Sequence, residues 1–400
     1  MHTLRRRAML TVTAVALVLP VVANGAATGA ARQESPPPGY PAQPGDVPFP
    51  TAEWATGDLP AVVDRRVVDQ AVDVAFGAPD AQGRVQSIVI VHGGRVVYER
   101  YHPLDGPDKV YDSYSVAKSF TSALIGLLVA DGELTLDDQP VQPEWQAVGD
   151  PRQAITLRNL LQMSSGLTWT EEYGEGSLAR QAFGAPDAAA VVAAQPLESQ
   201  PGTAWEYSTG TTMLLAGIAA DELGGCQQAK DYLNTRLLDP IGITSDTLLS
   251  DGGGCWFGGF GANMTTRDFA RFGLLYLRGG FWDGEQIVPV DWVNESRTPA
   301  STMANYGLQW WIQSPEVFSA LGLFGQQIVV VPNRDLVIAT NSTAGGDSQT
   351  MVGALLAATE TVTPPPAPPP PPPPPAPAPA RAPDDVLPPR QQPLGGWRSA

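Results

Sequence analysis

The sequence predicts an α+β fold for residues 64–360, with an antiparallel sheet flanked by helices and a separate helical lobe. One β-hairpin pattern lies near the start of this region, at 86–101, and a second lies near its end, at 327–340. The residues between the hairpins are rich in helix and loop patterns. The simplest way to bury the strands is to join both hairpins in one sheet, which leaves a cleft between sheet and lobe.

The first elements are a helix and a hairpin. Apolar residues recur at helical spacing over 65–76, which predicts an amphipathic helix. Two runs rich in β-branched residues follow, at 86–92 and 95–101, and only Gly93-Gly94 separates them. A two-residue glycine turn between such runs indicates a tight hairpin.

A second helix is expected from Ser115 to the Asp131-Gly132 pair. The run 120–129 is almost wholly apolar, which indicates a buried helix, so a lysine at 118 is unusual there. Near the end of the region, 327–331 and 336–340 form the second hairpin around a turn at 332–335. Residues 350–359 are expected to form a closing helix.

Ser115 and Lys118 are the candidate reactive pair. Positions i and i+3 share a helix face, so the hydroxyl and the amine can touch. The three histidines are His2, His92 and His102, so a Ser-His-Asp triad would need one of the last two. Ser115 also lacks the glycine pattern of a nucleophile elbow. The pair therefore indicates a serine nucleophile with lysine as its base.

A lysine base must be neutral. At the usual pKa of about 10.4, roughly one amine in 2,500 is neutral at pH 7. Burial and the positive end of the helix dipole would both lower the pKa of Lys118. The Ser115 N–H, at the helix start, is free to hold an oxyanion. The alternative is that Lys118 reaches solvent and Ser115 only caps the helix.

The motif Ser115-Val116-Ala117-Lys118 together with 131–138 closely resembles the penicillin-recognising serine hydrolases. That group includes class C β-lactamases, D-Ala-D-Ala carboxypeptidases, related esterases and 6-aminohexanoate-dimer hydrolases. The segments 155–167, 207–210 and 265–273 are also similar to the group, in order and spacing. The resemblance covers about residues 64–360 and implies a β-lactamase/transpeptidase-like fold.

The resemblance implies roles for individual residues. Tyr207 carries over as a tyrosine that helps to activate Ser115 and protonates the leaving group. Thr209 stands where the group often has asparagine, and Ala320-Leu321-Gly322 stands where β-lactamases and peptidases usually have Lys-Thr-Gly. This departure resembles the 6-aminohexanoate-dimer hydrolase and esterase branch. The N–H of Leu323 would then be the second oxyanion donor, beside that of Ser115.

Several residues are candidates for the substrate pocket, although the aromatic ones could equally be ordinary core or surface residues. They are Trp169, Tyr173, Thr209, Trp311 and Gln326. Glu171 and Glu172, beside the first two, are expected to form a solvated loop face.

Composition excludes some function classes. The net charge of −17 argues against nucleic-acid or anionic-membrane partners. No His, Cys, Asp and Glu residues cluster at ligand spacing, so no metal and no cofactor are expected. Cys226 and Cys255 favour a disulfide in an exported protein, with two separate buried thiols as the alternative.

The flanking segments suggest export. Residues 1–31 carry Arg5-Arg6-Arg7, an apolar stretch and small residues, the pattern of a signal peptide, with the twin-arginine and general secretory routes both open. Residues 32–63 form a Pro/Gly-rich lead-in. Residues 361–400 form a proline-rich disordered tail, either a plain spacer or a segment that reaches into the cell wall.

The sequence as a whole predicts a secreted or cell-envelope serine hydrolase that cleaves an ester or amide bond in a small-molecule or peptide-like substrate. One alternative is a β-lactamase or D-Ala-D-Ala carboxypeptidase. Another is a catalytically silent envelope-binding protein on the same fold. The physiological substrate and the oligomeric state stay open.

Overall fold

The computed structural model describes residues 40–41, 44, 47–77, 84–139, 142–343 and 345–363. The expected signal peptide, the first part of the lead-in at 32–39 and the proline-rich tail from 364 onward lie outside the described residues. Within those ranges, no helix combines the length and the apolar character needed to cross a bilayer.

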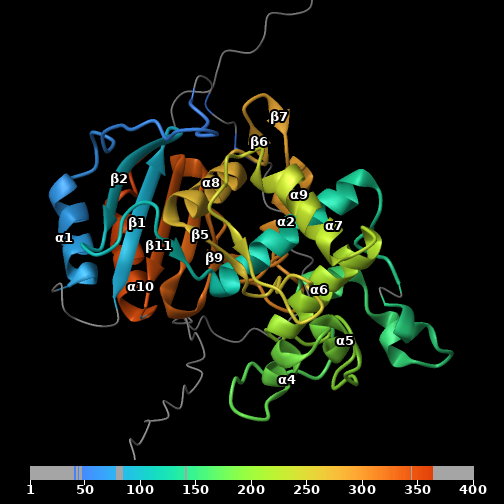
Figure 1. The fold of residues 1–400 in the computed structure, drawn as a ribbon. Coiled ribbons are helices and arrows are strands. Elements are labelled where there is room, and N and C mark those ends of the chain that lie inside the picture. The colour runs from blue at the N-terminus through green and yellow to red at the C-terminus, as the bar shows by residue number, and fades with distance from the viewer. Residues whose placement is uncertain are drawn as a thin grey trace, which may run out of the picture. The chain divides into compact units, whose positions relative to one another are not determined.

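The two predicted hairpins share one six-stranded sheet (Figure 1), as expected. Its strands in spatial order are β2 (Arg95–Tyr101), β1 (Val85–His92), β11 (Leu336–Ser342), β10 (Gln327–Val331), β9 (Val317–Leu321) and β8 (Trp311–Ser314). Antiparallel pairing of β1 with β11, which places Val89 opposite Ala339, joins the start of the domain to its end.

Both faces of this sheet are buried, because successive residues of a strand point to opposite sides. Ile88 and Ile90 pack under α1 (Arg65–Phe76) and α10 (Gly345–Ala358). Val89 and Val91 belong to the main core, together with Phe272 of α8 (Thr266–Leu277). Helix α10 begins before the expected 350–359. The sequence did not indicate this earlier start, because the first turn contains glycines, which are weak helix formers.

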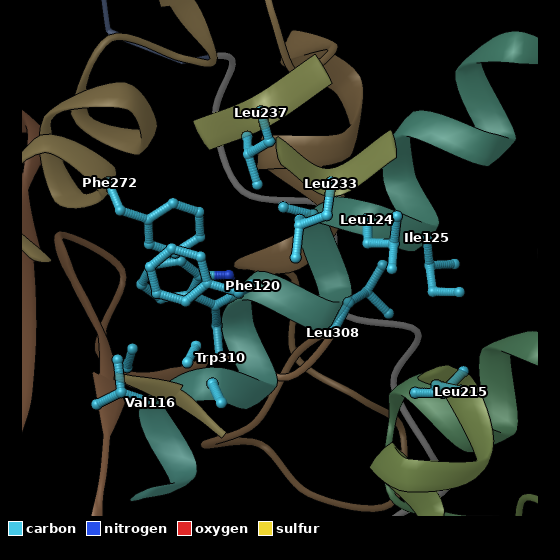
Figure 2. Close-up of a cluster of buried hydrophobic side chains, with 14 of the residues drawn as sticks. Val116, Phe120, Leu124, Ile125, Leu215, Leu233, Leu237, Phe272, Leu308 and Trp310 are labelled. Carbon is cyan, nitrogen blue, oxygen red and sulfur yellow. The ribbon is translucent and has the colours of Figure 1, made fainter. Parts of the chain in front are cut away.

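The middle of the chain forms the helical lobe, and α2 (Ala117–Asp131) is buried from its first residue to Leu128. Phe120 of α2 stacks on Phe272 with ring centroids 3.7 Å apart (Figure 2). The left-handed Gly132 ends the helix, as the sequence predicted. The other lobe helices are α3 (Leu157–Leu161), α4 (Leu178–Gly184), α5 (Ala188–Ala193), α6 (Thr209–Glu222), α7 (Cys226–Leu233) and α9 (Val290–Ser296).

Several short elements were not predicted, because they span too few residues to show a periodic pattern. Besides β8 and β9, the short strands are β3 (Val110–Tyr111), β5 (Ala262–Thr265) and β4 (Thr247–Leu248) in one small sheet, and β6 (Phe281–Trp282) with β7 (Glu285–Gln286) in another. The single-turn helices are η1 (Tyr114–Val116), η2 (Pro143–Gln146), η3 (Pro151–Ala154), η4 (Asn234–Leu238), η5 (Leu323–Gly325) and η6 (Pro332–Arg334).

The expected disulfide joins Cys226 and Cys255, which are 29 residues apart in the sequence. It ties the start of α7 to the glycine-rich loop 249–261. Closing a loop of this length contributes about 3–4 kcal/mol in the chain-entropy model. The loop matters for the site, because Gly259 lies beside Lys118.

Gly126 on α2 provides a test of the lobe packing. A Cβ at this position would lie 2.5 Å from the Trp292 ring nitrogen on α9. We expect Gly126→Ala to lower the free energy of unfolding by roughly 1–3 kcal/mol, as overpacked cores do. The control is Gly353→Ala on α10, where a Cβ meets nothing within 4 Å. It should raise the free energy by up to about 1 kcal/mol through helix propensity. Urea denaturation measures both, and equal effects would contradict the packing.

Candidate active site

Ser115 and Lys118 lie together where η1 leads into α2. The Lys118 Nζ is 3.1 Å from the Ser115 Oγ. Ser115 is half-buried and lies on η1, which directly precedes α2. The sequence had placed Ser115 at the start of that helix. Lys118 is only 1% exposed, so its amine does not reach solvent. The alternative of a solvent-facing lysine is therefore wrong.

The chain before Ser115 is fixed by the small sheet. The Ser113 N–H donates to the Asn263 side chain at 3.0 Å, and the Ser113 hydroxyl donates to the Phe260 carbonyl at 2.8 Å. Tyr114 has a φ of 44°, in the left-handed region that non-glycine residues rarely adopt. Strained residues of this kind concentrate at functional sites, where surrounding contacts hold them.

Two further oxygens surround the Lys118 amine. It lies 2.8 Å from Thr209 Oγ1, at the start of α6, and 2.8 Å from the Gly259 carbonyl. Burial lowers the pKa of Lys118 to about 8, and the negative charge of Glu171 opposes this shift. A neutral amine is therefore accessible near physiological pH, which a serine–lysine pair requires.

Tyr207 lies next to this pair, just before α6. Its ring centroid is 4.9 Å from the Lys118 Nζ. Burial raises the pKa of the Tyr207 phenol well above its ordinary value and Glu171 adds to the rise, while a hydrogen bond with Ser115 acts the other way. Tyr207 is therefore a neutral phenol at neutral pH. Burial thus favours the phenol over the phenolate.

Aromatic side chains form a wall around Tyr207. Trp311 is half-buried, with its ring centroid 5.7 Å from that of Tyr207. Tyr306 and Trp205 complete the cluster, at 6.3 and 6.1 Å from the Tyr207 ring. Trp311 thus lies beside Tyr207, and its role as a pocket residue stays a prediction.

The end of β9 runs beside η1. A Cβ on Gly322 would lie 2.7 Å from the Ser113 carbonyl oxygen and 3.4 Å from the Ser115 nitrogen, so this approach requires glycine. The Tyr114 and Phe324 rings pack edge to face at 5.3 Å. No described residue accepts a hydrogen bond from the N–H of Ser115 or of Leu323. Two N–H groups in adjoining segments can bind one developing oxyanion.

Two of the expected pocket residues, Trp169 and Gln326, are buried. Trp169 is 2% exposed and lies under Gly210, where a Cβ would meet its ring at 2.4 Å. Its ring packs against the first turn of α6. Gln326 is 4% exposed, and its side-chain oxygen accepts the Ser342 N–H at 3.2 Å. Its side-chain oxygen is thus engaged by β11, because Gln326 directly precedes β10, the strand that pairs with β11.

Glu171 is the residue that sequence reasoning missed, because it was assigned to a solvated face. It is half-buried and accepts hydrogen bonds from Trp169, Tyr173 and Thr209. Only Glu172 is exposed, as expected. Alternate residues of an extended segment share a side, so 169, 171 and 173 face together while 172 faces away. The aromatic residues on either side of Glu171 were the signal that could have identified it.

Within the part of the chain that the structure describes, no group of three or more His, Cys, Asp or Glu side chains could hold a metal ion.

The chain is similar to known proteins over most of the described residues. The family model described as Beta-lactamase matches residues 65–363. The 6-aminohexanoate-dimer hydrolase of Paenarthrobacter ureafaciens is 26% identical over 302 residues, which cover 66% of this chain and 75% of that protein. The lovastatin esterase of Penicillium rubens is 26% identical over 200 residues, 48% of this chain and 43% of the esterase.

A solved structure has the same fold. It is from Bacillus anthracis and provisionally named 6-aminohexanoate-dimer hydrolase. The TM-score is 0.63 and the identity is 22%, with 79% of this chain and 88% of that chain covered. The predicted β-lactamase/transpeptidase-like fold is therefore confirmed.

The protonation of Lys118 can be measured directly, because the chain has only three lysines, Lys109, Lys118 and Lys230. NMR of protein labelled with ¹³C at the lysine ε-carbon should give three signals. We expect the signal that disappears in Lys118→Met to titrate with a pKa of about 8, because burial disfavours the ammonium. A midpoint above pH 10 would show that the amine is solvated.

Proposed function

The chain belongs to the beta-lactamase family, and from this premise we propose that it is an exported serine hydrolase that cleaves an ester or amide bond through an acyl-enzyme on Ser115. The observation that carries the proposal is the buried Lys118 amine, 3.1 Å from the Ser115 hydroxyl. With a pKa of about 8, about one amine in ten is neutral at pH 7. The two-step route is that of covalent catalysis by an activated nucleophile.

In the first step the Ser115 Oγ attacks the substrate carbonyl carbon while its proton passes to the neutral Lys118 Nζ. The new C–O bond leaves a negative charge on the former carbonyl oxygen. The N–H groups of Ser115 and Leu323 are the proposed donors to this oxyanion. The approach of Gly322, next to Leu323, to the Ser115 nitrogen supports this role, and so does the lack of a described acceptor for either N–H group.

In the second step the tetrahedral intermediate collapses and the bond to the leaving oxygen or nitrogen breaks. The neutral Tyr207 phenol donates its proton to that atom and regains one from Lys118. Water then attacks the acyl carbon and gives its proton back through the same pair, which frees the acid and restores Ser115. The wide separation of the pKa values of Lys118 and Tyr207 supports this division into base and acid.

The segment 317–326, which runs beside Ser115, supports a proposal for the substrate class. Residues 317–326 contain no lysine or arginine. Ala320 and Leu321 are buried strand residues, 1% and 7% exposed. The segment therefore offers no cation to pair with the carboxylate of a β-lactam or a peptide terminus. The relatives named for an aminohexanoate dimer and for lovastatin support a small amide or ester instead.

Export is proposed from residues 1–31, and the disulfide supports it, since such bonds persist in oxidising compartments. A fluorophosphonate probe applied to the producing cells tests this point. The labelled chain should be found in the medium or the envelope, at a mass lower than that of the full sequence. Labelled full-length chain confined to the cytoplasm would contradict export.

Substitution of the three candidate residues tests the mechanism. Ser115→Ala should abolish hydrolysis of short-chain p-nitrophenyl esters, because it removes the nucleophile. Lys118→Ala and Tyr207→Phe should each lower kcat by roughly 10²- to 10⁴-fold, the usual contribution of a general base or acid. Ser301→Ala, at an exposed serine, is the matched control and should change nothing.

Full activity in Ser115→Ala would overturn the mechanism. A folded native protein that fluorophosphonate does not label would instead favour a silent binding protein.

A side-by-side substrate screen tests the substrate class. We expect turnover of p-nitrophenyl esters and short linear amides, and little turnover of a chromogenic cephalosporin, because no lysine is available for its carboxylate. Ser115→Ala measured with each substrate sets the background. Cephalosporin turnover as fast as ester turnover would favour a β-lactamase.

A further inference from the structure

We propose that Glu171 is a positioning residue of this site. It fixes the direction of the Thr209 hydroxyl, and this leaves the lone pair of the neutral Lys118 amine facing Ser115. The inference rests on the proposed function, because it takes Lys118 as the base. It is carried by the hydrogen bonds around one carboxylate and one amine.

The Glu171 carboxylate receives four hydrogen bonds, and a carboxylate can only accept. Its Oε2 accepts the Trp169 ring N–H at 2.5 Å and the Thr209 backbone N–H at 3.0 Å. Its Oε1 accepts the Tyr173 hydroxyl at 2.6 Å and also the Thr209 hydroxyl. The two N–H groups at Oε2 cannot reverse their direction, so they fix the carboxylate in this orientation.

Thr209 transmits this constraint to Lys118. A hydroxyl has one proton, and the Thr209 proton is directed at Glu171. Towards the Lys118 Nζ, 2.8 Å away, the Thr209 oxygen can then only accept. The Gly259 carbonyl, also 2.8 Å from the Nζ, can only accept as well.

The hydrogens on the Lys118 nitrogen determine where its lone pair points. A neutral amine has two N–H groups and one lone pair. Thr209 and Gly259 take both N–H groups, so the lone pair faces the third neighbour, the Ser115 Oγ at 3.1 Å. The Ser115 hydroxyl must then donate to Lys118, which is the direction that proton abstraction requires. Without the Glu171 carboxylate, the Thr209 hydroxyl could take this lone pair itself.

Glu171→Gln tests the inference with almost no change in shape. The glutamine oxygen must occupy the Oε2 position, because both groups there only donate. Its NH₂ group then occupies the Oε1 position and donates to Thr209, whose own proton turns towards Lys118. We expect kcat/KM for p-nitrophenyl esters, at its high-pH plateau, to fall by roughly 10²-fold. An unchanged plateau in folded Glu171→Gln would overturn the inference.

The pH profile separates positioning from a general loosening of the site. In the native enzyme kcat/KM should rise with pH through about 8, as Lys118 becomes neutral. Of the groups around the amine, Ser115, Thr209, Gly259 and the Tyr207 phenol are uncharged, and Glu171 is the charge that raises the pKa of Lys118. Glu171→Gln should therefore move this rise in kcat/KM, the rising limb of the pH profile, to lower pH. If water entered the site, burial would lower the pKa of Lys118 less, and the rising limb would move to higher pH. That result would contradict the proposal.

Matched variants complete the test. Glu172→Gln removes the exposed neighbouring carboxylate and should leave both the plateau and the limb unchanged. Thr209→Val should lower kcat/KM about tenfold, because one N–H of Lys118 loses its acceptor, and Thr209→Ser, which keeps the hydroxyl, should recover most of that loss. Adding Glu171→Gln to Thr209→Val should cost little more, because no hydroxyl remains to reverse. Full activity in Thr209→Val would overturn the inference even if Glu171→Gln fails to fold.

The outcomes for Ser115 keep the two proposals apart. If Ser115→Ala and Lys118→Ala are inactive while Glu171→Gln keeps the native plateau and limb, only the positioning role fails. If Ser115→Ala is fully active, the proposed function fails first.

Discussion

The site depends on one constraint, an amine buried among three oxygens that come from three parts of the chain. Lys118 is 1% exposed, and its contacts are Ser115 on η1, Thr209 on α6 and Gly259 in the loop 249–261. A buried ammonium is costly, whereas a buried neutral amine with satisfied N–H groups is not. Folding therefore favours the base form of Lys118, and the same burial that lowers its pKa makes it reactive.

The rest of the fold holds these oxygens in place. Apolar packing of α2 against α8, with Phe120 stacked on Phe272, fixes the helix that bears Lys118. The Cys226–Cys255 disulfide tethers the loop that carries Gly259. The sheet brings the end of β9 beside η1, where only a glycine at 322 fits. The sheet, the helical lobe and the loop 249–261 each contribute residues to the site, so the site exists only in the complete domain.

Patterns within a few residues could be read from the sequence, and distant pairings could not. The helix 65–76, both hairpins and the Ser115–Lys118 spacing are local, and the structure has them where they were expected. The strands β8 and β9 are too short to show a period. Glu171 was misassigned because its link to the site runs through Thr209, 38 residues further on. Gln326 was expected in the pocket, but its side-chain oxygen accepts the Ser342 N–H of β11, 16 residues further on.

The sequence by itself determined the chemistry available to this protein. A serine three residues before a rare lysine, in a chain with no histidine after position 102, leaves an amine as the natural base. Only the tertiary structure decided whether that amine is neutral and where its lone pair points. Burial and the direction of hydroxyl protons depend on groups far apart in the chain, because both are properties of the packed environment and not of a local pattern.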